Sequence, residues 1–250
     1  MSTTAECTLE VPLSSLREAI SAVVVHAEPT KAGDDVTAFQ RVRLTAAADE
    51  LLVLATSGTT TALAAVEIVE DSRAERFADD DGSFSVDLSP GLIKRVASTF
   101  KSGGPNVDAD QEMLRLHFTD DLITVTDVSG LWPGMAIALP TLPYSSDYPD
   151  VAGILAKALG AAGEAQTAKP LVTSGGVVAL FRHAAKAYGM PLQFEATGPN
   201  TSRGFIVWCG PSFVGAVSSQ HNDDDSLAKR DSMRRKHLER LGLQPALAGL

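Results

Sequence analysis

The chain is poor in the residues that build metal sites and disulfides. It has two cysteines, Cys7 and Cys209, each in an apolar strand pattern with no second cysteine or histidine at metal-binding spacing. We interpret both as structural thiols. The five histidines share no common spacing, and no His-Glu-x-x-His pair occurs. We therefore expect no bound metal and no cofactor.

Long apolar runs and catalytic signatures are also missing. No run approaches the roughly 18 apolar residues that a membrane-spanning helix needs. Residues 1–6 lack the basic and apolar regions of a signal peptide, so we expect a cytoplasmic protein with no membrane partner. No Gly-rich phosphate loop, Gly-x-Ser-x-Gly elbow or carboxylate pair tied to a histidine occurs, which argues against an enzyme.

The charge is unevenly distributed. The formal net charge of −10 excludes a uniformly basic surface for nucleic acid, but it leaves room for local basic faces. Acidic residues concentrate in predicted loops, whereas several lysines and arginines fall on predicted helices. The acidic runs are at residues 34–35, 79–81, 120–121 and 223–225.

One pattern recurs three times: a short strand, an amphipathic helix and then a series of alternating strands. We call each occurrence a unit, and the units begin near Cys7, Ser83 and Lys169. Repeats of this length are typical of stacked architectures, which scaffold proteins use more than enzymes do. The order predicts an α+β fold built from repeats of strand, helix and antiparallel meander.

The elements of each unit follow from periodicity and capping signals. For the first unit we expect a strand over 7–13, a helix that begins at Ser14 or Ser15 with a Ser15–Glu18 capping box, and strands over 39–44, 51–55 and 59–69. For the second we expect a strand over 83–88, a helix capped by Ser89 with Pro90 at its first position, and strands over 113–118, 122–128 and 135–139. For the third we expect a strand from Leu171, a helix over 175–188, and strands over 192–196, 204–209 and 213–217.

Basic residues mark one side of the second and third helices. Lys94 and Lys101 are seven residues apart with Arg95 beside them, and Arg182 and Lys186 are four apart, so each set shares a helix face. These five residues are our candidate DNA contacts. The alternative is that they form ordinary solvated helix faces.

Three stretches together resemble the DNA sliding-clamp family, in its bacterial β-clamp branch of polymerase processivity factors. They are residues 39–55, the helix that opens at Ser89, and residues 135–150, and the resemblance covers about the first 150 residues. It implies a ring of six similar domains with helices on the inner face, sheets outside and duplex DNA in the hole. It also implies non-specific phosphate contacts, a homo-oligomer, and a replicative DNA polymerase and clamp loader as partners.

The resemblance and the proline-rich break after residue 139 predict the domain organisation. We expect a clamp-like domain over residues 1–145, a linker or short helix over 146–168, a compressed second domain over 169–221 and a charged tail over 222–250. The second domain shows one clear unit where a clamp domain has two. Either its other half has diverged, which would give a trimer, or the chain has another assembly or none. The alternative function is therefore an interaction module that forms no ring on DNA.

Overall fold

The computed structural model confirms the predicted α+β class, with helices packed on antiparallel sheets. It describes residues 6–30, 36–47, 49–69, 83–101, 112–119, 121–160, 173–197 and 204–218, and positions 228, 229, 232, 233 and 236. The predicted connector over 71–82, the strand from Leu171 and nearly all of the predicted tail lie outside these residues.

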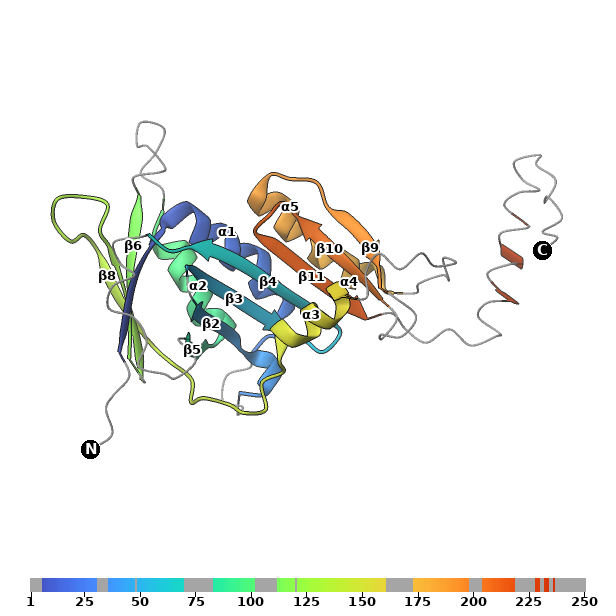
Figure 1. Ribbon diagram of the computed structural model, residues 1–250, viewed down its shortest axis with the longest axis horizontal. Coiled ribbons are helices and arrows are strands. Elements are labelled where there is room, and N and C mark those ends of the chain that lie inside the picture. Colours follow the sequence, from blue (N-terminus) through green and yellow to red (C-terminus); the bar gives the residue numbers. More distant parts are fainter. Residues whose placement is uncertain are drawn as a thin grey trace.

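The described elements follow the three units in order (Figure 1). The first unit comprises β1 (Cys7–Pro12), α1 (Leu13–Val23), β2 (Val42–Ala47), β3 (Glu50–Thr56) and β4 (Thr60–Glu67), with 3-10 turns at Val24–His26 and Ala38–Gln40. The second comprises β5 (Ser83–Leu88), α2 (Pro90–Thr99), β6 (Met113–Phe118), β7 (Leu122–Asp127) and β8 (Ala136–Pro140). After α3 (Val151–Gly160), the third comprises α4 (Gly175–Leu180), α5 (Arg182–Tyr188), β9 (Gln193–Ala196), β10 (Gly204–Cys209) and β11 (Phe213–Ser218).

The two leading helices start in different ways. Ser89 caps α2 as predicted, since its hydroxyl accepts a hydrogen bond from the Leu92 amide at 3.4 Å. The predicted capping box of the first helix is wrong, because α1 begins directly after β1 with Pro12 at the cap and no side-chain capping bond. The Leu13 amide instead donates to the Glu112 carbonyl at 2.8 Å, so a neighbouring segment satisfies a donor that a cap would have satisfied.

Two further predicted elements differ from the structure. The strand expected from residue 39 begins at Val42, because Thr37 and Gln40 close a 3-10 turn in which the Thr37 amide donates to Gln40 Oε1 at 3.1 Å. The single helix expected over 175–188 is divided at Phe181. There the Phe181 amide donates to the Val178 carbonyl three residues back, which tightens the turn between α4 and α5.

The first two units exchange their leading strands. β1 pairs antiparallel with β6 of the second unit, and β5 pairs antiparallel with β2 of the first. The sheet orders are β1-β6-β7-β8 and β5-β2-β3-β4-β11-β10-β9. Neither unit therefore completes its own sheet.

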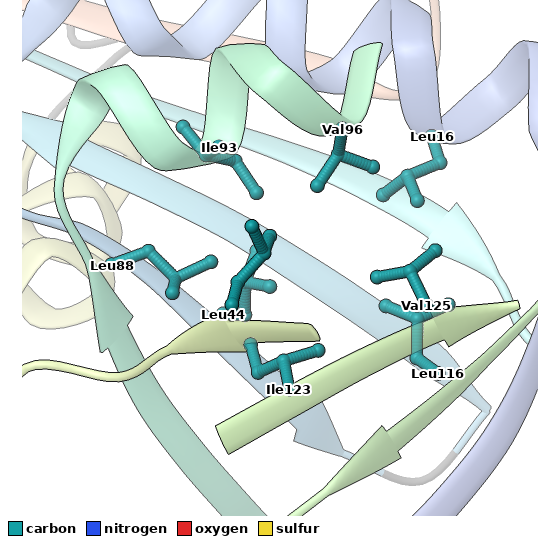
Figure 2. A pocket seen from close by; sticks show the side chains of 9 residues that line it. Leu16, Leu44, Leu88, Ile93, Val96, Leu116, Ile123 and Val125 are labelled. Carbon is teal, nitrogen blue, oxygen red and sulfur yellow. The ribbon is translucent and has the colours of Figure 1, made fainter. Parts of the chain in front are cut away.

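The two units share one apolar core as a consequence of this exchange. Figure 2 shows aliphatic side chains from both units converging on one point. A lining without polar groups identifies the space as part of the core, since nothing there could orient a ligand. The side chains are Leu16 of α1, Leu44 of β2, Leu88 of β5, Ile93 and Val96 of α2, Leu116 of β6, Ile123 and Val125 of β7, and Leu139 of β8.

The third unit extends the sheet of the first. β11 pairs antiparallel with β4, from Phe213 opposite Ala64 to Val217 opposite Thr60. The result is one seven-stranded sheet that ends at β9.

The helices divide between the two faces of this sheet. On β3, Val53 and Ala55 belong to the core that contains α1, α2 and α5, whereas Leu54 belongs to a separate cluster with Val151 and Leu155 of α3. Successive residues of a strand face opposite sides, so α3 covers the face opposite to the other helices. Figure 1 shows α3 on the near side of the sheet and α1 on the far side.

Candidate nucleic-acid interface

Three helices lie side by side on one face of the long sheet. α1 contacts α2 on one side and α5 on the other. Ile93 of α2 and Phe181 at the start of α5 are buried in the core, which fixes the orientation of both helices. Their opposite sides are therefore presented to solvent.

Four of the predicted DNA-contact residues lie on these solvent-facing sides. Lys94 and Arg95 are exposed on α2, and Arg182 and Lys186 are exposed on α5. None of the four forms an ion pair with a described carboxylate. By contrast, Arg41, Arg43 and Arg115 are all used in ion pairs elsewhere in the fold.

Charges from both α2 and α5 affect the pKa of one histidine, His183. Burial lowers the pKa of His183, and the nearby charges of Arg182, Lys186 and Lys94 lower it further. Lys94 belongs to a different unit from His183, so the fold brings cations of the second and third units close enough to interact. α2 and α5, which both pack against α1, therefore lie on the same side of the sheet.

Acidic residues do little to neutralise this face. α2, α4 and α5 contain no aspartate or glutamate, and α1 contributes Arg17 together with Glu18. Burial raises the pKa of Glu18, which lies next to Arg17 on the same helix. The surface of α1, α2 and α5, which we call the cationic helix face, therefore carries unpaired positive charge within an acidic protein.

Lys101 does not lie where the helical spacing places it. α2 ends at Thr99, and Phe100 turns the chain into an extended conformation with φ −88° and ψ 108°. Phe100 is buried, so packing of its ring accompanies the end of the helix. Lys101 is exposed just beyond the end of α2. The prediction that Lys94 and Lys101 share a face of one helix is therefore wrong.

Sequence reasoning passed over His183, which lies among these cations. The signal was present, because His183 lies between Arg182 and Lys186 on the same short helix. A histidine in such a place can donate a hydrogen bond to an anion. The structure adds it to the candidate interface.

Many solved structures of sliding clamps share the fold. The DNA polymerase III subunit beta from Pseudomonas aeruginosa is 11% identical to this chain, over 86% of this chain and 66% of its own length, with a TM-score of 0.56. The DNA polymerase sliding clamp from Bacillus subtilis is 14% identical, over 89% and 67%, with a TM-score of 0.54. A sliding clamp from Bartonella birtlesii bound to griselimycin is 10% identical, over 90% and 68%, with a TM-score of 0.56.

The chain has the sliding-clamp fold. At the level of sequence, no protein-family model matches it, and a search of curated proteins finds no match. The chain spans about two thirds of the length of the clamps that it resembles.

Three features of the described residues concern metal ligands, cysteines and membrane spans. Within the described residues, no three His, Cys, Asp or Glu side chains gather as metal ligands would. Cys7 and Cys209 are both buried. No helix in the described ranges has the length and apolar character to cross a membrane.

Proposed function

We propose that this protein is a DNA sliding-clamp-like processivity factor that holds duplex DNA against the cationic helix face. The observation that carries the proposal is the set of four unpaired cations, Lys94, Arg95, Arg182 and Lys186, on neighbouring helices of one face. The chain is acidic overall, so this concentration of positive charge is local. Its role is architectural and not catalytic.

Phosphates are the chemical partner that such a face suits. Lysine and arginine side chains on exposed helix surfaces neutralise the DNA backbone without reading base edges. Contacts of this kind leave the protein free to move along the duplex, because no base-specific bond fixes its position. Lys101 at the end of α2 and His183 on α5 would add to the same surface.

The proposal extends to assembly and partners. A homo-oligomeric ring in the cytoplasm would encircle duplex DNA and tether a replicative polymerase, with a clamp loader to open it. A trimer is the ring that a compressed second domain favours. These partners come from the likeness to sliding clamps and go beyond the fold itself.

The first test measures the salt dependence of DNA binding. The double variant K94E/K186E should bind a short duplex weakly, and the slope of log affinity against log salt should fall by about 2 units, because each phosphate contact contributes about 0.9. The matched control is K157E, an exposed lysine on α3 at the opposite face of the sheet. An unchanged slope in K94E/K186E, or an equal loss in K157E, would contradict the assignment.

The second test asks whether the protein encircles DNA. Protein loaded on a nicked circular plasmid should stay bound through a high-salt wash and should be released when the plasmid is linearised. Surface binding alone would be lost at high salt from both templates. Equal release from circular and linear DNA would rule out a ring.

A second candidate function is a protein-interaction module that uses the clamp scaffold without encircling DNA. It is favoured by Leu131 and Trp132 in the β7–β8 connection, which are 100% and 84% exposed. Exposed aromatic and aliphatic side chains of this kind are common in protein interfaces. Protein binding that W132A abolishes, in the absence of any DNA binding, would favour this candidate.

A further inference from the structure

His183 is the one histidine on the three helices that form the cationic helix face. Histidine is the side chain whose ordinary pKa lies closest to neutral, whereas lysine and arginine side chains remain charged there. Near neutral pH, the positive charge of this face therefore varies mainly through the protonation of His183.

The His183 ring lies on one flank of α5, beside cations that point outward. Ala184 is buried in the core, whereas Arg182 and Lys186 are exposed and His183 is half-buried. His183 precedes Lys186 by three residues, so the two side chains are neighbours on the helix surface. An anion that binds Lys186 therefore comes within reach of the His183 ring as well.

A second helix brings a further cation to the same ring. The 3-10 turn at Val24–His26 contacts α2, and the His26 ring centroid lies 4.6 Å from that of Phe181 at the start of α5. α2 and α5 both approach this turn, and the charge of Lys94 on α2 acts on His183 as a result. The cluster of Lys94, His183 and Lys186 thus joins the second and third units.

The charges that act on His183 are all positive. Burial lowers the pKa of His183 below its ordinary value, and the charges of Arg182, Lys186 and Lys94 lower it further. The ring forms no hydrogen bond or ion pair with another residue in the described ranges. In the free protein, the neutral ring is therefore the favoured form near neutral pH.

The surrounding elements supply little negative charge to stabilise a protonated ring. On α1, α2, α4, β10 and the 3-10 turn, the side chains that can carry a charge are Arg17, Glu18, Lys94, Arg95, Cys209 and His26. Glu18 is the one carboxylate in this set, and its charge acts on Tyr188 near the end of α5. An anion that docks beside His183 would therefore supply the negative charge that these elements lack.

We propose that His183 takes up a proton when a phosphate of duplex DNA docks beside Lys94 and Lys186, so that DNA binding strengthens as the pH falls. The inference rests on the proposed function, because the phosphate belongs to DNA held on the cationic helix face. A phosphate there would offset the cations that disfavour a charged ring, and it would accept a hydrogen bond from the ring. Both effects favour the protonated form, so proton uptake and DNA binding promote each other.

The direction of the pH effect follows from this coupling. The pKa of His183 is higher in the DNA complex than in the free protein, so the added affinity is absent above the value in the complex. It grows as the pH falls and is complete below the value in the free protein. A hydrogen bond to a charged group is worth about tenfold or more in affinity, and one more phosphate contact steepens the slope of log affinity against log salt by about 0.9.

The test measures the affinity of the full chain for a short duplex by fluorescence anisotropy at about pH 8 and about pH 5.5. Wild-type affinity should rise about tenfold at the lower pH, with the steeper salt slope. H183Q should bind with nearly equal affinity at both pH values, and H183R, which is always charged, should also lose the pH dependence. The pKa of His26 is about 4, so His26 stays neutral throughout this range.

The matched control is H117Q. His117 lies on β6 in the other sheet, where its Nδ1 is 2.9 Å from the Thr8 hydroxyl, so H117Q should keep the wild-type pH dependence. Calorimetry in two buffers of different ionisation enthalpy counts the protons taken up on binding, and the count should be higher for wild type than for H183Q. Circular dichroism at both pH values checks that each variant is folded.

The outcomes separate this proposal from the proposed function. A pH dependence and a proton uptake that H183Q retains in full would overturn the role of His183, while DNA binding that K94E/K186E weakens would still support the interface. Wild-type affinity that does not change between the two pH values would overturn it equally. Absence of DNA binding at both pH values would instead refute the proposed function, and the coupling with it.

Discussion

The first two units and the third unit have the same order of elements but bury their strands to very different extents. β2 alternates buried and half-buried residues along its whole length, whereas three of the four residues of β9 are exposed. The difference arises because β2 receives a leading strand and an opposing sheet from another unit. A single unit of this fold is therefore half of a domain and cannot bury its own apolar face.

Charged residues hold the exchange together in the complete pair. Asp87 on β5 lies opposite Arg43 on β2, with Nε–Oδ1 and Nη2–Oδ2 distances of 2.7 and 3.0 Å, and its carboxylate also meets Arg41 at 3.3 Å. The Asp87 side chain is fully buried. Arg43 also lies over the ring of Tyr148, 4.2 Å from the centroid, so the segment that leaves β8 is held against the sheet by the same cation.

The largest expected effect comes from breaking this buried group. D87A should lower the free energy of unfolding by about 4 kcal/mol, because it leaves Arg41 and Arg43 with uncompensated buried charge. Denaturant unfolding, monitored by circular dichroism, measures this loss in the free energy of unfolding. The loss should appear as a shift of the midpoint without a second transition if the two units unfold together.

The matched control is the equivalent pair on the other exchanged strand. Glu10 on β1 lies opposite Arg115 on β6, with an Nη2–Oε1 distance of 2.7 Å, but the Arg115 side chain is 47% exposed. E10A should therefore cost about 1 kcal/mol or less. Equal losses in D87A and E10A would show that burial does not distinguish the two exchanged strands.

The junction between the complete pair and the third unit offers the next test. His26 is fully buried there, with its ring centroid 4.6 Å from that of Phe181, and neither ring nitrogen has a partner among the described residues. Burial, with a smaller contribution from His183, lowers the pKa of His26 from 6.5 to about 4. The neutral form is therefore the one that the folded state favours.

The sign of the pH effect follows from this shift. The contribution of neutral His26 to the free energy of unfolding is complete above the unfolded-state pKa of 6.5. It is lost as the pH falls toward about 4, to a total of about 3 kcal/mol. H26L should remove this part of the pH dependence of unfolding, and H183Q serves as the control for the neighbouring histidine. Because Glu18 shifts in the opposite direction, the measured quantity is the difference between each variant and wild type at pH 7 and pH 4.5. Parallel profiles for H26L and wild type would contradict the assignment.

Much of the fold could be predicted from the sequence because its signals are local. Ser89 and Pro90 mark a helix start by their own chemistry, and the alternation over β2 and β6 marks strands. Within each helix, spacing alone places the cations on one side, Lys94 with Arg95 on α2 and Arg182 with Lys186 on α5. Their location next to one another across two units depends on packing of α1 between α2 and α5, which no local signal reports.

The exchanged strands could not be predicted for the same reason. β1 and β5 look like strands that belong to the units that they precede, and only long-range pairing assigns them to the other unit. The start of α1 was missed because its cap comes from Glu112, about a hundred residues away in the chain. Lys101 was misplaced because burial of Phe100 ends α2 before the amphipathic pattern does.

The smallest expected effect tests how closely the third unit packs on the first. Gly215 on β11 lies beside β4, and a Cβ at this position would collide with the Phe181 ring and lie 3.0 Å from the Thr61 carbonyl oxygen. G215A should therefore lower the free energy of unfolding by about 2 kcal/mol by overpacking the junction. G91A on the exposed start of α2, where a Cβ meets nothing within 4 Å, should instead stabilise by about 0.5 kcal/mol. Thermal unfolding of both variants measures the difference, and a neutral G215A would mean that the third unit can move on the sheet at little cost.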